Sequence, residues 1–383
     1  MSLQELSDIS RFYGANPDYV IAGGGNTSFK DGPFLYIKGS GTSLAEISPG
    51  DFVKMDRNVL AGIWDKQYPA DPDAREAAVL SDMMAARCPG EEGKRPSVET
   101  LLHDILPYTY VVHTHPSLVN GITCAQKGEE AARDLFSGDA IWIPSTNPGY
   151  VLSRAVRTAF ESFRAERGKG AEIIFLQNHG VFVGADSAAG IRAVYERIMN
   201  TLGAKVLRKA DPGGRCGAYG DSGAFAAELR ALAEKSGPGL PWFVRFERNN
   251  EIANFVKDRA SFWPVSRAFS PDHIVYAGSD PLFVEGAAGE AWEAHLAKTG
   301  RIPKIIALRG CGIFGLGNTE KTAATAVELF VNAVEVAVYT ESFGGPLFMT
   351  EDKIDFINNW EVERYRSEIA FSGGGPAASP KGA

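Results

Sequence analysis

The sequence has few cysteines and no surplus of positive charge, and each shortage excludes a class of protein. Its four cysteines, Cys88, Cys124, Cys216 and Cys311, are far apart and form no CxxC pair. The sequence therefore indicates neither a disulfide framework nor a cysteine zinc site. With 39 basic and 47 acidic residues the net charge is −8, so no basic field exists to hold DNA or an anionic membrane. Any phosphate that this chain binds must be met by a local site.

Long apolar runs are also missing. No uninterrupted stretch reaches the roughly 20 apolar residues of a membrane span, and residues 1–14 lack the apolar segment of a signal peptide. A content of 44% apolar and 22% charged residues is typical of a globular protein, and 383 residues suffice for two or three domains. We therefore expect a cytoplasmic protein, either an enzyme or a binding module for a small molecule.

What the sequence does contain is an alternation of helical and strand patterns. Helical patterns occupy 73–87, 97–105, 151–165 and 188–208, and strand patterns occupy 34–37, 108–115 and 172–183. Ser97 follows Pro96 and is the expected N-cap of its helix. The alternation predicts an α/β fold in which helices cover a sheet.

The chain also repeats part of itself. Residues 171–186 and 303–318 share five identical residues at a constant offset of 132. Further matches at an offset of 133 pair Pro148 with Pro281 and Val151 with Val284. A nearly constant offset over about seventy residues indicates a diverged copy of the latter half of the first module.

Composition suggests the bounds of these modules. We predict a catalytic module over 1–210, a linker region rich in glycine and proline over 211–240, a shorter diverged repeat over 241–371, and a flexible tail over 372–383.

Two histidines on one strand give the strongest chemical signal. His113 and His115 lie in VVHTHP, where strand alternation points both side chains to the same face. His179 follows a second buried strand pattern, in LQNHG. A single histidine is more often a packed residue than a ligand, but three imidazoles that leave a position open are the ligand set of a catalytic zinc site.

An acidic residue lies on the helix that leads to this strand. In the first helical turn, Glu99 can simply stabilise the helix N-terminus. Beside a metal, the same carboxylate can act as a general acid/base. His103 shares the helix face of Glu99, and we expect it to be packed or hydrogen-bonded and not to be a fourth ligand.

The glycine cluster before residue 30 is not a dinucleotide site. Gly23-x-Gly25-x-x-Ser28 nearly matches that fingerprint, but FKDGP follows it in place of a helix. Tight turns require glycine in any case. Together with the turn at 40–41 and with Ser97, however, the cluster can offer N–H groups to a phosphate. A metal site with such groups predicts a phosphorylated small substrate.

The segments GGGNTSFK, SVETLLH, VVHTHP and LQNHGVFV, in this order and spacing, resemble the class II aldolase/adducin family over about residues 8–210. The resemblance implies an α/β/α sandwich with a mainly antiparallel central sheet. It implies that His113, His115 and His179 hold Zn²⁺ or another divalent metal and that Glu99 is the catalytic acid/base. The phosphate-binding positions that it implies are Asn26, Ser40, Gly41 and Ser97. Val98 departs from the family pattern, in which fuculose-phosphate aldolases have a second serine.

This resemblance implies a lyase that cleaves a ketose 1-phosphate, such as L-rhamnulose or L-fuculose 1-phosphate, to dihydroxyacetone phosphate and an aldehyde. The layout resembles the aldolase part of bacterial bifunctional rhamnulose-1-phosphate aldolase/short-chain dehydrogenase proteins, without the dehydrogenase domain. The family also contains sugar-phosphate dehydratases, epimerases and non-catalytic adducin-like interaction modules, and these alternatives stay open. The resemblance further implies a homo-oligomer, a tetramer, and a two-module chain could instead close the ring as a dimer. From the net charge we expect no nucleic-acid or membrane partner.

The second copy lacks the metal-binding residues. At an offset of 132, Cys311 corresponds to His179, while Arg245 and Glu247 correspond to His113 and His115. An arginine cannot ligate zinc. We therefore expect a structural module without a metal site, in which Cys311 is a small buried core residue.

Overall fold

The computed structural model describes residues 2–136 and 138–360. Within these residues the chain forms two units, one comprising 2–119, 128–204 and Trp360, the other comprising 120–127 and 205–359. The tail expected at 372–383 lies outside the described residues, as does the end of the module expected at 241–371.

A seven-stranded sheet with the order β3-β2-β1-β4-β7-β6-β5 is the centre of the first unit. All neighbouring strands in it are antiparallel except β5 and β6. The strands are β1 Asn26–Asp31, β2 Phe34–Lys38, β3 Phe52–Asp56, β4 Tyr110–Thr114, β5 Ala140–Ile143, β6 Ile173–Leu176 and β7 Gly180–Ala185.

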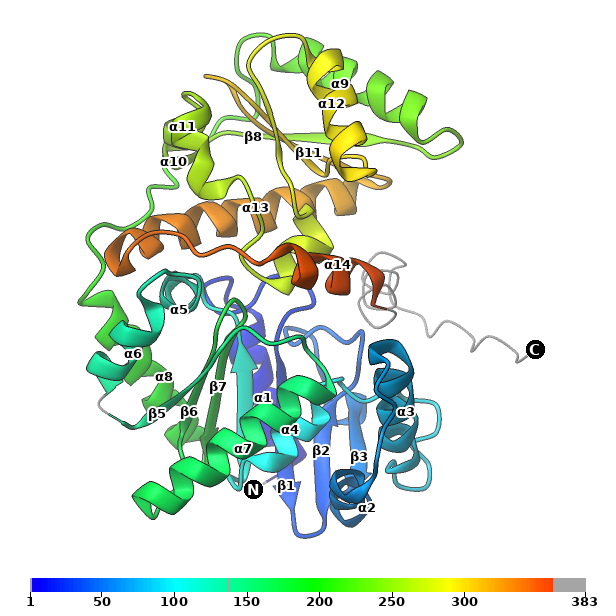
Figure 1. The fold of residues 1–383 in the computed structure, drawn as a ribbon, viewed down its shortest axis with the longest axis vertical. Helices are drawn as coiled ribbons and strands as arrows, with labels where there is room; N and C mark the ends of the chain where they lie inside the picture. Colours follow the sequence, from blue (N-terminus) through cyan, green and yellow to red (C-terminus); the bar gives the residue numbers. More distant parts are fainter. Residues whose placement is uncertain (1, 137, 361–383) are drawn as a thin grey trace. The chain divides into compact units, whose positions relative to one another are not determined.

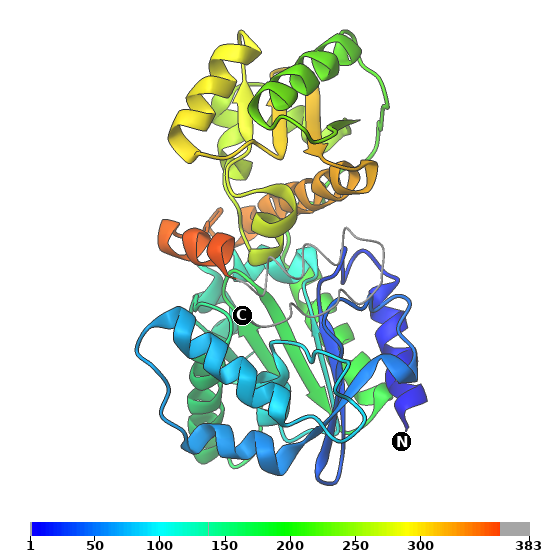
Figure 2. The ribbon, with the colours of Figure 1, turned by 90° about the vertical axis from the view of Figure 1, so that its right-hand side faces the viewer.

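Helices cover both faces of this sheet, which confirms the predicted sandwich of the class II aldolase type. On one face, Leu102 of α4 and Val156 of α7 pack against Phe182 of β7. On the other face, Tyr195 of α8 is hydrogen-bonded to Thr114 of β4 over 2.8 Å, and α1 lies beside β1 (Figure 1). Figure 2, turned by 90° from Figure 1, shows helices on the two sides of this sheet. The helices of this half of the chain are α1 Leu3–Gly14, α2 Arg57–Gly62, α3 Pro72–Ala85, α4 Thr100–Ile105, α5 Ser117–Thr123, α6 Gly128–Phe136, α7 Tyr150–Arg167 and α8 Ala188–Gly203.

Two helices differ from their predicted bounds. The helix expected at 97–105 begins only at Thr100, because Pro96 is held in a β-bridge with Gly39 and the next residues form a turn. The N-cap position is that of Glu99, so Ser97 is not the N-cap as predicted. Its Oγ accepts a hydrogen bond from the backbone N–H of Glu99 over 3.3 Å within the preceding turn. The helix expected at 188–208 ends at Gly203, a residue of low helix propensity.

The second unit has a four-stranded sheet with the order β8-β11-β10-β9. Helix α13 covers one face and helices α9 and α12 cover the other (Figure 1). Its strands are β8 Phe243–Glu247, β9 Leu282–Val284, β10 Ile305–Leu308 and β11 Gly312–Gly317. Its helices are α9 Ser222–Ser236, α10 Asn250–Phe255, α11 Arg259–Phe262, a π-helix His273–Ala277, α12 Ala288–Thr299, α13 Glu320–Thr340 and α14 Glu351–Asn359. The stretch Glu320–Phe343 is long and apolar enough to cross a membrane, but most of it is buried within the protein, as in a core helix.

The second sheet repeats the strand order and directions of β4-β7-β6-β5. Ile306 pairs with Phe314 as Ile174 pairs with Phe182, at the predicted offset of 132. Helices α8 and α13 are both capped by a hydroxyl side chain, that of Ser187 in one and that of Thr319 in the other. The second unit is therefore a shorter, diverged copy of the latter half of the first.

The predicted pairing of Val151 with Val284, at an offset of 133, is wrong. Val151 lies in α7, whereas Val284 lies in β9. The register instead makes β9 equivalent to β5, because Leu282 lies opposite Ile306 as Ile141 lies opposite Ile174. The connections between equivalent strands differ in length, so a constant offset cannot hold there.

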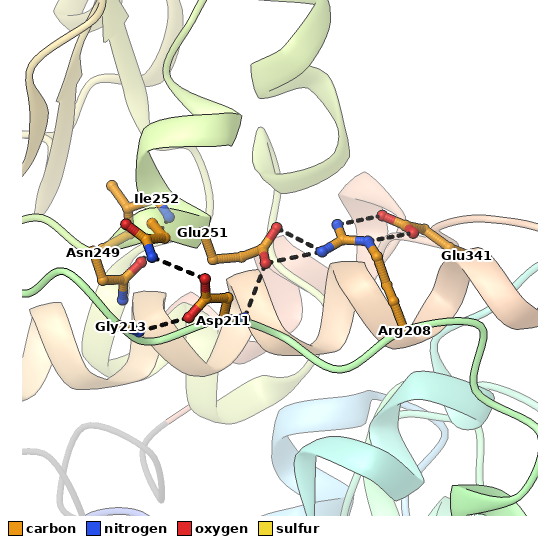
Figure 3. Close-up of polar contacts among 8 residues, drawn as sticks. Arg208, Asp211, Gly213, Asn249, Glu251, Ile252 and Glu341 are labelled. Atoms are coloured by element: carbon orange, nitrogen blue, oxygen red, sulfur yellow. Dashed lines mark hydrogen bonds and ion pairs between the residues drawn. The ribbon is translucent and has the colours of Figure 1, made fainter.

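Arg208 holds the first residues of the second unit by hydrogen bonds to two glutamates of that unit (Figure 3). Its Nη1 donates to both carboxylate oxygens of Glu251 over 2.9 Å, and its Nε and Nη2 donate to Glu341 over 3.0 and 2.8 Å. The backbone N–H of Asp211 also donates to Glu251, over 3.0 Å. Residues 205–213 are thereby held by hydrogen bonds. Farther along the region predicted as a linker, Leu229 of α9 belongs to the second core.

We expect Arg208→Ala to lower the free energy of unfolding by about 1–3 kcal/mol, because the buried Glu251 carboxylate would lose its charged partner. The control is Arg259→Ala, which breaks an exposed ion pair with Glu285 and should cost less than about 1 kcal/mol. Urea unfolding of the full chain measures both values. Equal losses would show that the Arg208 network contributes no more than a surface ion pair.

Candidate metal centre

Three histidines meet at one end of the first sheet. His113 lies on β4, His115 follows that strand, and His179 lies in the turn between β6 and β7. One ligand nitrogen from each lies within 4.8 Å of the other two, and the Nε2 atoms of His113 and His115 are 2.9 Å apart. Two nitrogens bound to one tetrahedral zinc ion lie about 3.3 Å apart. The ring positions therefore approach those of a metal centre.

Gly180 allows this meeting. A Cβ atom at this position would lie only 2.6 Å from the carbonyl oxygen of Thr114 and 2.6 Å from Cδ2 of His115. The turn before it is tight, since Asn178 has a φ of 59° and the N–H of His179 donates to Leu176 O over 3.1 Å. Glycine is thus required at this position for the turn before β7 to place His179 beside His113 and His115.

His113 is held in the orientation that a metal ligand needs. Its Nδ1 donates to the carbonyl oxygen of Val181 over 2.9 Å, and its ring stacks on Phe182 with centroids 4.0 Å apart. A donor at Nδ1 leaves the lone pair of the neutral ring on Nε2. Such a hydrogen bond fixes the tautomer and ring direction of a metal-binding histidine.

Glu99 faces the same point. Its Oε1 lies 3.5 Å from Nε2 of His113 and 3.6 Å from Nε2 of His179. This oxygen is buried and accepts no hydrogen bond from any residue that the structure describes. A buried carboxylate oxygen without a donor is costly unless a cation lies beside it. Three nitrogen donors and this oxygen therefore fit a divalent ion.

The other oxygen of Glu99 is fully engaged. Asn26 Nδ2 donates to Glu99 Oε2 over 2.5 Å and to Ser97 Oγ over 3.2 Å. Behind Asn26, its Oδ1 is hydrogen-bonded to His103 Nε2, while His103 Nδ1 lies 2.8 Å from Ser28 Oγ. Burial holds the pKa of His103 well below its usual range, with the charges of Lys30 and His113 lowering it further. The prediction that His103 is packed and hydrogen-bonded is confirmed.

Sequence reasoning missed this chain of contacts. Asn26 pairs with His113 in the β1–β4 register, which places it beside a glutamate far away in the sequence. The polar residues at alternate positions of β1, Asn26 and Ser28, were the only available signal.

The predicted phosphate-binding residues lie near one another. Asn26 is hydrogen-bonded to Ser97, and the backbone N–H of Ser40 donates to Arg95 O over 2.7 Å. Gly41 follows in the same turn, with a φ of 86°. Because the Asn26 amide nitrogen is committed to Glu99 and Ser97, its role in phosphate binding stays a prediction, as do the roles of Ser40, Gly41 and Ser97.

The register of the second sheet corrects the predicted equivalents of two histidines. Phe246 lies opposite Phe314 as His113 lies opposite Phe182. Phe246 and Arg248, and not Arg245 and Glu247, therefore occupy the places of His113 and His115. Between β4 and β8 the offset is therefore 133 and not 132.

Arg248 and Cys311 fill the equivalent place in the second unit. The guanidinium of Arg248 donates to the carbonyl oxygens of Gly310 and Cys311 and lies over the Tyr219 ring, 4.0 Å from its centroid. Cys311 is buried, as expected, and this burial raises the pKa of its thiol. A guanidinium in this place opposes the binding of a second cation.

We accordingly expect one divalent ion per chain and an unchanged ion content in Cys311→Ala. His113→Ala should lose the ion, because removing a first ligand leaves too few donors. Elemental analysis of the purified, dialysed proteins gives the stoichiometry. Two ions per chain in the native protein would contradict this assignment.

A second expectation concerns Gly180→Ala. The added methyl group must displace the Thr114 carbonyl or the His115 ring, so metal affinity should fall by about tenfold or more, and stability by about 1–3 kcal/mol. Gly62→Ala, at a position with open space around it, is the control and should change neither quantity appreciably. Metal titration and thermal unfolding measure both; normal metal affinity in Gly180→Ala would refute the role given to this glycine.

Several known proteins are similar to this chain. The sequence profile of the class II aldolase and adducin N-terminal domain matches residues 4–202. Uncharacterized oxidoreductase YuxG of Bacillus subtilis (strain 168) is 21% identical in an alignment 421 residues long. The alignment covers 96% of this chain and 58% of that protein. The chain therefore spans little more than half the length of this relative.

The solved structures to which this chain is similar include the N-terminal class II aldolase domain of a conserved protein from Thermoplasma acidophilum. It is 26% identical, with a TM-score of 0.46, over 53% of this chain and 93% of that one. L-fuculose-1-phosphate aldolase from Thermus thermophilus is 16% identical, with a TM-score of 0.31, over 52% of this chain and 89% of that one. By the match of its first 202 residues, this chain belongs to the class II aldolase and adducin family.

Proposed function

We propose that this chain is a divalent-metal-dependent lyase that cleaves a ketose 1-phosphate to dihydroxyacetone phosphate and an aldehyde. The observation that supports this most strongly is the buried Oε1 of Glu99, which faces three histidine nitrogens. L-rhamnulose 1-phosphate and L-fuculose 1-phosphate are the first candidate substrates.

The residues divide the reaction between them. A divalent ion held by His113, His115 and His179 would act as a Lewis acid on the oxygens of the ketose. When the C3–C4 bond breaks, its electron pair stays on C3, and the C4 hydroxyl gives its proton to solvent as it becomes the aldehyde. Glu99 would give a proton to C3 through Oε1, since Oε2 is held by Asn26.

The phosphate would lie on the side of Ser97. Ser97 Oγ accepts hydrogen bonds from Asn26 Nδ2 and from the backbone N–H of Glu99, which turns its own hydrogen toward another acceptor. The turn that contains Ser40 and Gly41 is bridged to residues 95–96. A phosphate bound by these groups would place the carbon chain of the substrate next to Glu99.

We expect Glu99→Gln to keep the metal and to lose about 10²- to 10⁴-fold in kcat, because the amide cannot transfer the proton. His115→Ala should lose metal and activity together, whereas His295→Ala, outside the histidine group, should keep both. Aldehyde release from a panel of ketose 1-phosphates provides the assay.

The same experiment separates the alternatives. Full turnover by Glu99→Gln with normal metal content would contradict the proposed mechanism. Conversion of the sugar phosphates without release of dihydroxyacetone phosphate would instead indicate a dehydratase or an epimerase. A purified native chain that binds no divalent metal would favour an adducin-like interaction module.

A further inference from the structure

Four polar side chains form a buried chain of hydrogen bonds that ends at Glu99. Ser28, His103, Asn26 and Glu99 follow one another in it, and none is more than 7% exposed. Two come from β1 and two from the segment of α4. Because water does not reach these groups, each orientation is decided by its neighbours.

The direction of every hydrogen bond follows from the carboxylate at the end of the chain. Glu99 Oε2 can only accept, so the Asn26 atom that faces it is Nδ2, and the atom that faces His103 is the acceptor Oδ1. His103 therefore carries its hydrogen on Nε2. Burial keeps the ring neutral, so Nδ1 has a lone pair and accepts from the hydroxyl of Ser28.

This direction matters because an asparagine amide has two nearly isosteric ends. With the amide turned around, Asn26 Oδ1 would face Glu99 Oε2 across 2.5 Å, and two acceptors at that distance repel. Glu99 would then have to rotate away from the three histidines. Only the hydrogen bond from His103 opposes that reversal on the Oδ1 side among the described residues.

We propose that His103 is a positioning residue, which fixes the Asn26 amide in one orientation and so holds Glu99 with Oε1 facing the three histidines. The inference rests on the proposed function, in which Glu99 transfers a proton. His103 itself touches neither substrate nor metal in this assignment.

Two substitutions of His103 distinguish the role of Nε2 from that of Nδ1. In His103→Gln, the amide nitrogen takes the place of Nε2 and can donate to Asn26. In His103→Asn, the shorter side chain can replace only Nδ1 and meets Ser28. Both variants remove a buried ring, so their effects on stability should be similar.

The second unit provides a matched control. His273 is buried, its Nδ1 lies 3.1 Å from Ser270 Oγ, and its Nε2 lies 3.0 Å from Asn332 Oδ1. It therefore has the same two kinds of partner as His103, but it is not among the three clustered histidines. The Gln and Asn variants of His273 measure how the loss of a buried structural histidine changes stability and the exchange rate.

The experiment uses the full chain loaded with Zn²⁺ and dihydroxyacetone phosphate in D₂O. NMR follows the exchange of the C3 hydrogen: the C–H bond breaks, Glu99 takes the proton, and deuterium returns to C3. This probe does not depend on which aldehyde the enzyme releases. We expect His103→Asn to lower kcat for exchange about 10- to 100-fold, with KM and zinc content nearly unchanged. His103→Gln should recover most of that loss, and the His273 variants should leave the exchange rate unaltered.

A second readout needs neither metal nor activity. Nitrogen-15 spectra of the metal-free native protein should show His103 protonated on Nε2 and not on Nδ1. Protonation on Nδ1, or equal exchange rates in native protein and His103→Asn, would overturn the inference while leaving the proposed function intact. Absence of exchange in the zinc-loaded native chain would overturn the proposed function and this inference with it.

Discussion

The close approach of β7 to β4 at Gly180 is the constraint on which the metal centre depends. Nothing larger than hydrogen fits between this residue and the Thr114 carbonyl, and the turn that carries His179 reaches the other histidines only from there. The second unit keeps the same approach, since a Cβ at Gly312 would lie 2.8 Å from Glu247 O and 2.7 Å from the Phe246 ring. Both units therefore share the backbone arrangement, and side chains alone decide that one presents three histidines to a common point while Arg248 occupies the equivalent place in the other.

Burial then gives each polar group in the first unit a single arrangement. Glu99 has one oxygen held by Asn26 and the other facing imidazole nitrogens. His113 has one ring nitrogen held by the Val181 carbonyl and the other facing Glu99. In both residues, one polar atom is hydrogen-bonded to a backbone carbonyl or an amide side chain. The other polar atom, Glu99 Oε1 or His113 Nε2, faces the point where the three histidines meet. Such preorganisation removes the need to rearrange the site as charge develops in a reaction.

The sequence predicted the parts of this structure that depend on local periodicity. Strand alternation placed His113 and His115 on one face, and the offset of 132 matched β10 and β11 with β6 and β7. It could not predict contacts that depend on sheet register, such as Asn26 with Glu99, or the helix start at Thr100, which a distant bridge to Gly39 determines. The offset of 132 does not hold for the strand before β10, because α7 has 18 residues and α12 only 12, so the equivalent strands are differently spaced.

The proposed chemistry depends above all on a divalent ion that lies between the three histidines and Glu99. Anomalous X-ray diffraction from crystals grown with Zn²⁺ tests it directly, at energies on either side of the zinc absorption edge. We predict one anomalous peak within about 2.0–2.1 Å of a ring nitrogen from each of His113, His115 and His179, with Glu99 beside it. A zinc-containing crystal without a peak between these residues, or with its strongest protein-bound peak in the second unit, would contradict the account.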